Sequence, residues 1–205
     1  MFKNIILFLK EYIPCNVFCI FALYFYIMNE SQIIEQAQKG SQTALHQIYL
    51  AHAGYMQSVC SRYILCDEEV KDVMQESFIK IFSNIKSFKY RGAGSLRSWM
   101  TRIMINEALR TIKQKMHTLE IEDVMADVAE YDTEDASEVP PDAIHEMIRE
   151  LPQGYRTVLN LYIFEEYSHK EIAAMLGISE LTSASQLHRA KKLLKKNIIE
   201  YKKKQ

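Results

Sequence analysis

Apolar side chains recur at three- and four-residue steps along most of the sequence after residue 29. This spacing predicts helices over Ser31–Lys39, Thr43–Ile64, Asp67–Ile85 and Ser95–Lys115, because residues so spaced share one face of a helix. Only six Gly and four Pro occur among 205 residues, which favours long helices with short turns over a sheet-rich fold. We therefore expect an all-α protein.

The net charge of −1 conceals three blocks of opposite sign. Lys80–Lys115 holds nine basic residues against one acid, residues 118–150 hold twelve acids against one base, and residues 189–205 hold eight bases against one acid. The acidic block contains EVPP and has weak periodicity, which indicates a flexible linker. We expect two small helical domains joined by this linker, so that the chain consists of an apolar N-terminal extension (1–28), a first domain (29–116), the acidic linker (117–141) and a second domain (142–205).

The second domain is expected to be helical as well. Its predicted helices are Asp142–Glu150, Gln153–Phe164, His169–Leu176 and Glu180–Tyr201.

The segment Tyr12–Met28 is almost wholly apolar and has about the minimum length of a membrane-spanning helix. Pro14 and Asn16 oppose that interpretation, and no small-residue cleavage site of a signal peptide precedes Asn29. Our preferred hypothesis is that translation starts at Met28. The alternative is a membrane tether, so membrane contact is expected only if residues 1–27 are translated.

Residue types that carry catalysis or bind metals are not grouped in the sequence. The four cysteines form no Cys-x-x-Cys or Cys/His cluster with zinc spacing, which favours a reduced protein without structural disulfides. No catalytic triad or phosphate-binding loop is evident. We therefore expect a cytoplasmic binding protein that is not an enzyme and that needs no metal ion or cofactor.

The most informative stretch is YSHKEIAAMLGISELTSASQLHRAKKLLKK, residues 167–196. Ser168 and Glu171 form a Ser-x-x-Glu capping box that starts a helix. Gly177 suits the end of that helix because it tolerates positive φ, and Ser179 can cap a second helix. A helix, a short turn with glycine and a helix make up a helix-turn-helix, whose second helix enters the major groove of DNA.

The second of these helices has two unlike faces. At about 100° per residue, Leu187, Ala190 and Leu194 gather on one side, which would pack on the domain. The other side carries side chains that can bond to bases or phosphates, and lysines follow it. An ordinary solvated face is the alternative. The candidate DNA contacts here are Thr182, Ser185, Gln186, Arg189 and Lys192.

In the first domain the basic block interleaves cations with aromatic rings, a combination that suits single-stranded nucleic acid. Phe82 keeps the phase of the apolar face and is expected in the core, whereas Trp99 fits either the core or a base-stacking site. Lys89, Tyr90 and Arg91 fall at the break before a helix, which is a plausible place for contacts. The preceding helix has an acidic face that suits either a protein partner or solvent.

Taken together, two blocks of residues resemble the RNA polymerase sigma factors of the extracytoplasmic-function (ECF) class of the sigma-70 family. The first block is similar to regions 2.2 to 2.4 of the family and consists of Asp72-x-x-Gln75-Glu76-x-Phe78-x-x-x-Phe82, Phe88-x-x-Arg91-Gly92 and Leu96-Arg97-Ser98-Trp99-Met100-x-Arg102-Ile103-x-x-Asn106. The second block is similar to region 4 and consists of Leu151-Pro152, Tyr155-Arg156-x-Val158, Tyr167-Ser168-x-x-Glu171-Ile172-Ala173, Gly177-Ile178-Ser179 and Leu187-x-Arg189-Ala190.

The resemblance implies a transcription initiation factor whose partners are core RNA polymerase, promoter DNA and an anti-sigma protein. The core polymerase contacts that it implies are Asp72, Gln75, Glu76 and Phe78. The implied residues that open and read the minus-10 element are Lys89, Tyr90, Arg91, Arg97, Trp99, Arg102, Asn106 and Arg110. The implied minus-35 contacts are Ser179, Thr182, Ser185, Gln186, Arg189 and Lys192.

Three positions of the second helix depart from the family pattern. Leu181 stands where the family usually has a small residue, Ala184 where it has a basic one, and Gln186 where Arg is frequent. The departures affect the promoter contacts of this helix and not the fold.

Two other classes of protein compete with the sigma factor. A stand-alone helix-turn-helix regulator would bind duplex DNA without polymerase, but it needs a dimerisation or effector domain, and residues 29–115 show no evident pocket or heptad repeat. A membrane-anchored signalling protein is supported only by the apolar opening segment.

Overall fold

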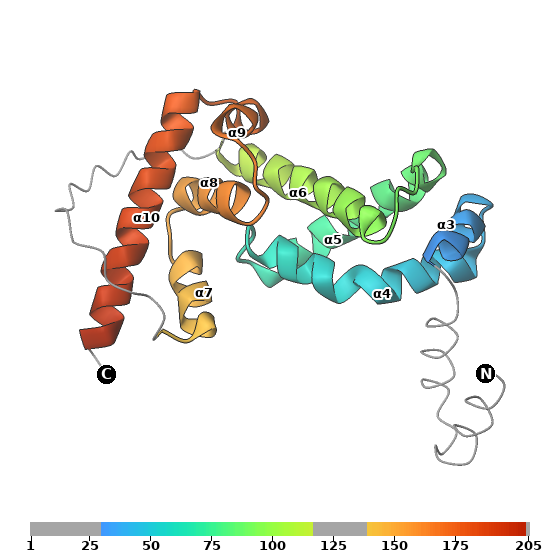
Figure 1. Ribbon diagram of the computed structural model, residues 1–205, viewed down its shortest axis with the longest axis horizontal. Coiled ribbons are helices and arrows are strands. Elements are labelled where there is room, and N and C mark those ends of the chain that lie inside the picture. Colours follow the sequence, from blue (N-terminus) through green and yellow to red (C-terminus); the bar gives the residue numbers. More distant parts are fainter. Residues whose placement is uncertain (1–29, 117–138, 204–205) are drawn as a thin grey trace, which may run out of the picture. The chain divides into compact units, whose positions relative to one another are not determined.

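The computed structural model describes residues 30–116 and 139–203, whose regular structure is entirely helical (Figure 1). The all-α prediction is confirmed for these residues. The predicted N-terminal extension and nearly all of the predicted linker lie outside the described residues, and the predicted domain boundaries stay a prediction. None of the helices in residues 30–116 and 139–203 is both long and apolar enough to cross a lipid bilayer.

The helices agree closely with those predicted, and the largest difference is at the end of α4 (Gln42–Ser61), which was expected at Ile64. In chain order they are α3 (Glu30–Gln38), α4 (Gln42–Ser61), α5 (Asp67–Asn84), the short 3-10 helix η1 (Ile85–Ser87), α6 (Ser95–Met116), α7 (Pro141–Arg149), α8 (Gln153–Ile163), α9 (His169–Leu176) and α10 (Glu180–Lys203).

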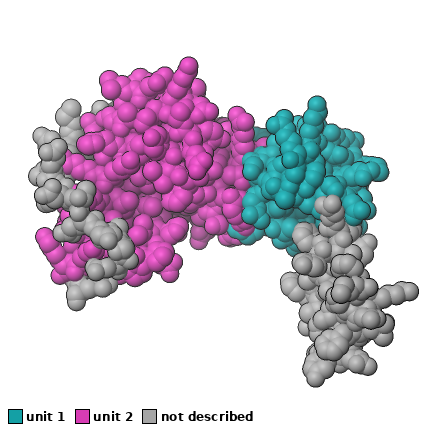
Figure 2. All heavy atoms as spheres, in the orientation of Figure 1, with its two compact units in different colours: residues 1–54, 78–100 teal, residues 55–77, 101–205 magenta. Residues whose placement is uncertain are grey.

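The chain divides into two compact units, which Figure 2 draws in different colours. Unit 1 comprises residues 1–54 and 78–100, and unit 2 comprises residues 55–77 and 101–205. Helices α4, α5 and α6 therefore contribute residues to both units, whereas α7 to α10 belong to unit 2 alone.

In unit 1, the side-chain amide of Gln38 ties α3 to the chain that follows α5. Its Nε2 donates to the carbonyl oxygens of Ile85 (3.0 Å) and Phe88 (2.7 Å). Ile33 and Ile34 of α3 are buried in the same unit, as is Leu96 at the start of α6. These contacts fix the ends of the segment from residue 88 to residue 95, which carries several predicted DNA contacts.

In unit 2, α10 packs against α7, α8 and α9, and Figure 1 shows it as the long red helix. Val158 and Leu161 of α8 and Ile172 of α9 are fully buried. The buried guanidinium of Arg156 donates from Nη1 to the carbonyl oxygens of Arg149 (2.9 Å) and Leu151 (2.8 Å), so it satisfies carbonyls at the end of α7. Unit 2 thus has a well-packed helical core beneath α10.

Candidate functional site

The turn between α9 and α10 is defined by local hydrogen bonds. Ser168 Oγ accepts from the Glu171 backbone N–H (3.3 Å), and Glu171 Oε2 accepts from the Ser168 backbone N–H (2.9 Å), which confirms the predicted capping box. Gly177 ends α9 with a φ of 73°, and the Thr182 backbone N–H donates to Ser179 Oγ (2.9 Å). The predicted helix-turn-helix is therefore present.

The inner face of α10 is fixed against α8 and α9. Ser183, Leu187 and Ala190 are buried, and Ser183 Oγ lies 3.0 Å from His169 Nδ1 at the start of α9. The His169 ring in turn stacks on the Tyr162 ring of α8, with centroids 4.7 Å apart. These contacts decide which face of α10 is left for a ligand.

All six predicted minus-35 residues lie on α10 or at its N-terminal cap. Ser179, Thr182 and Ser185 are exposed, while Gln186, Arg189 and Lys192 are half-buried. The Ser179 and Thr182 hydroxyls bond to each other at 2.8 Å. The Gln186 amide lies over Gly154 of α8, 3.4 Å from the place where a Cβ would stand there, so it packs within the domain. Leu181, which the sequence analysis named only as a departure from the family pattern, is exposed on the same helix, and so is His188, which sequence reasoning missed.

Helix α6 carries a polar stripe within unit 2. Arg102, Asn106 and Arg110 follow each other at four-residue steps and are all exposed, which places them on one face. Arg110 Nε donates to Glu107 Oε1 (2.7 Å), and this carboxylate, which is buried, raises the pKa of Arg110. Glu107 is the one acid of the basic block, and it neutralises a guanidinium at the stripe.

The loop before α6 belongs to unit 1. Lys89, Tyr90 and Arg91 are exposed there, and the Tyr90 hydroxyl donates to Glu30 Oε2 at 3.4 Å. The centroid of the half-buried Trp99 ring lies 5.0 Å from the centroid of the buried Phe88 ring, and the angle between the ring planes is 40°. Trp99 therefore packs on one side and keeps part of its ring surface in solvent. This position lies between the two that the sequence left open, a core position and a base-stacking site.

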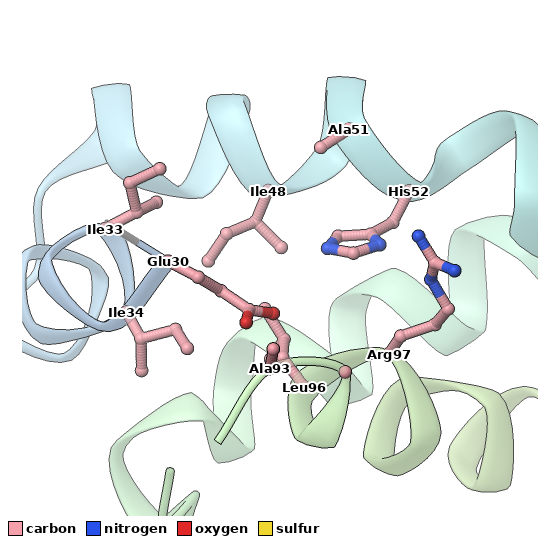
Figure 3. A pocket seen from close by; sticks show the side chains of 10 residues that line it. Glu30, Ile33, Ile34, Ile48, Ala51, His52, Ala93, Leu96 and Arg97 are labelled. Carbon is pink, nitrogen blue, oxygen red and sulfur yellow. The ribbon is translucent and has the colours of Figure 1, made fainter. Parts of the chain in front are cut away.

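A cavity of about 570 Å³ in unit 1 lies beside the predicted minus-10 residue Arg97. Apolar side chains such as Ile48 and Leu96 line it, together with Glu30, His52 and Arg97 (Figure 3). His52 Nδ1 is buried without a hydrogen-bond partner. Burial lowers the pKa of His52, and the nearby Arg97 lowers it further, against the opposite effect of Glu30. Nothing in the sequence pattern indicated this cavity.

Helix α5 carries the four predicted core polymerase contacts. Asp72, Gln75 and Glu76 are exposed, but Phe78 is only 5% exposed. The Phe78 ring packs against Tyr49, at 4.8 Å between ring centroids, and against Phe82, at 5.6 Å. Its neighbour Ile79 is 58% exposed, and sequence reasoning missed it.

No group of three or more His, Cys, Asp or Glu side chains in residues 30–116 and 139–203 is arranged to hold a metal ion.

Comparison with known proteins accounts for both halves of the chain. Residues 48–118 match the family model for sigma-70 region 2, and residues 142–194 match the model for sigma-70 region 4. The RNA polymerase sigma-H factor of Pseudomonas aeruginosa is 28% identical over 82% of this chain and 92% of its own length. The ECF RNA polymerase sigma factor SigW of Bacillus subtilis is 29% identical over 80% of this chain and 94% of its own length.

Among solved structures, the chain is similar to the sigma factor RpoE in complex with the anti-sigma factor NepR from Bartonella quintana, with 19% identity and a TM-score of 0.46, over 75% of this chain and 95% of that one. The two family models match the two halves in the order that sigma factors require, and the curated relatives are matched over nearly their whole length. The chain therefore belongs to the sigma-70 family and is an ECF sigma factor, which directs RNA polymerase to promoters.

Proposed function

We propose that this sigma factor works through three separate surfaces. Helix α5 contacts core polymerase, the loop before α6 and the exposed stripe of α6 contact the minus-10 element, and α10 contacts the minus-35 element. The stand-alone helix-turn-helix regulator is not favoured, because the relatives that match the chain are polymerase sigma factors.

The observation that carries this proposal is the two-sided character of α10. One side is buried through Ser183, Leu187 and Ala190, and the helix begins directly after the glycine turn. A recognition helix reads bases with residues of its N-terminal part, and here Leu181, Thr182 and Ser185 of that part are exposed. Ser185 and Arg189 lie one turn apart and supply a hydroxyl and a guanidinium, which suit phosphates and base edges.

Support for the minus-10 surface comes from charge and from aromatic rings. The polar stripe of α6 presents Arg102 to solvent, and such a cation neutralises phosphate, whereas Arg110 is paired with Glu107. Tyr90 and Trp99 retain exposed ring surface, on which unstacked bases of an opened strand can stack.

The core polymerase surface combines polar residues with an exposed apolar side chain. Interfaces of this kind place an apolar anchor among polar groups that exclude water. Asp72, Gln75 and Glu76 supply the polar groups and Ile79 the anchor. Phe78, which is buried, acts by holding the helix in place through Tyr49 and Phe82.

The acidic segment from residue 117 to residue 141, which the sequence predicts to be a flexible linker, is proposed to tether the two DNA-binding domains. Tethered modules raise each other's effective concentration at paired sites, so even weak contacts to two promoter elements reinforce each other.

The protein is proposed to act in the cytoplasm, where core polymerase and DNA are found. An anti-sigma protein is the inhibitor that the family resemblance implies.

The experiment that tests this proposal is reconstitution with core polymerase. The full chain, and in parallel the chain from Met28, is mixed with core and passed through gel filtration. Co-elution is expected, together with its loss in Ile79→Lys. Arg189→Ala is the matched control, and this variant should still co-elute with core polymerase. If the Arg189 side chain contacts a base, its loss should weaken minus-35 binding by about 1–3 kcal/mol.

Two outcomes contradict the proposal. One is failure of the unmodified chain to bind core polymerase. The other is tight binding to duplex promoter DNA without polymerase that core polymerase does not enhance.

A further inference from the structure

Leu181, the second residue of α10, is 79% exposed, more than any other exposed large hydrophobic residue in the described part of the chain. A leucine in this state contributes little to packing in the folded protein, because most of its apolar surface still contacts water. It stands where the family pattern has a small residue. The fold therefore does not account for this side chain.

The position of Leu181 is set by the phase of α10. Ser183, Leu187 and Ala190 mark the buried side of the helix. Leu181 lies one turn before Ser185 and two turns before His188, and all three are exposed. Leu181 thus begins the ridge opposite the buried side, in the N-terminal turn with which a recognition helix reaches base edges.

Two polar neighbours of Leu181 already have partners within the protein. The Thr182 hydroxyl bonds to Ser179 Oγ at 2.8 Å, and the Gln186 amide packs over Gly154. Ala184 offers only a methyl group. Leu181 is therefore the exposed apolar side chain in the first turn and a half of α10, and the polar side chains of Glu180 and Ser185 are exposed beside it.

In the major groove, one base carries an apolar group on its edge. The C5-methyl group of thymine is recognised by apolar side chains, and no other base has a counterpart. We propose that Leu181 contacts the C5-methyl group of a thymine in the minus-35 element and thereby sets the promoter preference of this sigma factor. This inference rests on the proposed function of α10 in minus-35 recognition.

The test replaces thymine by deoxyuridine, which removes the methyl group and leaves every hydrogen-bonding group of the base in place. Holoenzyme is assembled from core polymerase and the full chain, and a promoter is selected from duplex DNA with a randomised minus-35 segment. Each thymine of the selected segment is then replaced in turn. We expect holoenzyme binding to weaken about fourfold at one position, the factor for one buried methyl group.

Two variants make the test specific. Leu181→Ala is expected to bind the thymine and deoxyuridine promoters equally well. Leu50→Ala, which removes a leucine of α4 that is 56% exposed, is the matched control and should keep the full preference for thymine.

Three results overturn the inference. Deoxyuridine has no effect on the unmodified chain, or its effect is the same in Leu181→Ala, or Leu181→Ala lowers transcription without changing promoter binding, which places Leu181 in a protein contact. Failure of the proposed function is recognised separately, because holoenzyme then does not assemble in gel filtration and no promoter is selected.

Discussion

His169 Nδ1 and Ser183 Oγ lie 3.0 Å apart and join the first turn of α9 to the buried face of α10. Ser183 is fully buried, so this contact is made inside the domain. It helps to fix the rotation of α10 about its own axis, and that rotation decides which side chains of α10 face away from the domain. If α10 reads the minus-35 element as proposed, promoter recognition depends on a residue that cannot itself contact the promoter.

Ser183→Ala should lower the free energy of unfolding of the domain by about 0.5–1.5 kcal/mol, because it removes a hydrogen bond and leaves His169 Nδ1 without its partner. Denaturant unfolding followed by circular dichroism measures the change. Ser185→Ala is the matched control, since Ser185 is exposed on the same helix. Equal effects of the two substitutions on stability would contradict the role given to Ser183.

Gly177→Ala should destabilise the helix-turn-helix by about 1–2 kcal/mol, because Gly177 has a φ of 73° and side chains disfavour that conformation. Gly54→Ala is expected to act in the opposite direction. Gly54 lies inside α4 with open space at its Cβ position, and alanine there stabilises a helix by about 0.5–1 kcal/mol. Thermal unfolding of both variants checks the pair, and two changes of the same sign would contradict it.

Cys60 and Cys66 should differ sharply in reactivity. Cys60 is fully buried, and burial raises the pKa of its thiol to about 12, whereas Cys66 is exposed. The thiolate is the reactive form, so iodoacetamide at pH 8 should alkylate Cys66 and spare Cys60 until the protein unfolds. Peptide mapping by mass spectrometry distinguishes the two. Rapid alkylation of Cys60 in the folded protein would show that the packing around it is wrong.

His52 should make unit 1 less stable in mild acid. Its pKa is lowered by burial first and by Arg97 second, so the unfolded chain takes up a proton at a higher pH than the folded chain. The pKa of a histidine in the unfolded chain is about 6.5. The stability that neutral His52 contributes is therefore complete above that pH and is lost as the pH falls below it. His52→Gln should reduce this dependence in urea unfolding at pH 7.5 and pH 5.5. An unchanged pH dependence in the variant would contradict the assignment.

The helices of this protein were predictable because their signals are local. The capping box at Ser168 and Glu171 lies within one turn of chain, and the positive φ of Gly177 requires a residue without a Cβ. The phase of α5 was equally readable: Phe78 falls on the apolar face with Val70, which is why it is buried although it is one of the predicted polymerase contacts.

Other features of the candidate site depend on packing between helices that are distant in sequence. Gln186 falls on the polar face of α10 by spacing alone, and it turns inward only because Gly154 of α8 leaves room for its amide. Glu107 is likewise buried next to Arg110, although its charge would place it at the surface. The residue pattern along one helix does not show which side chains a neighbouring helix will bury.

Transcription by the reconstituted holoenzyme tests the central claim most directly. Core polymerase with the full chain should produce run-off transcripts from a promoter selected from randomised DNA, with one start site at a fixed distance from the selected elements. Core polymerase alone should produce none, and Arg189→Ala should lower the yield while it still co-elutes with core. Transcription that is equal with and without the chain, or a chain that binds the promoter as tightly without polymerase as with it, would contradict the account.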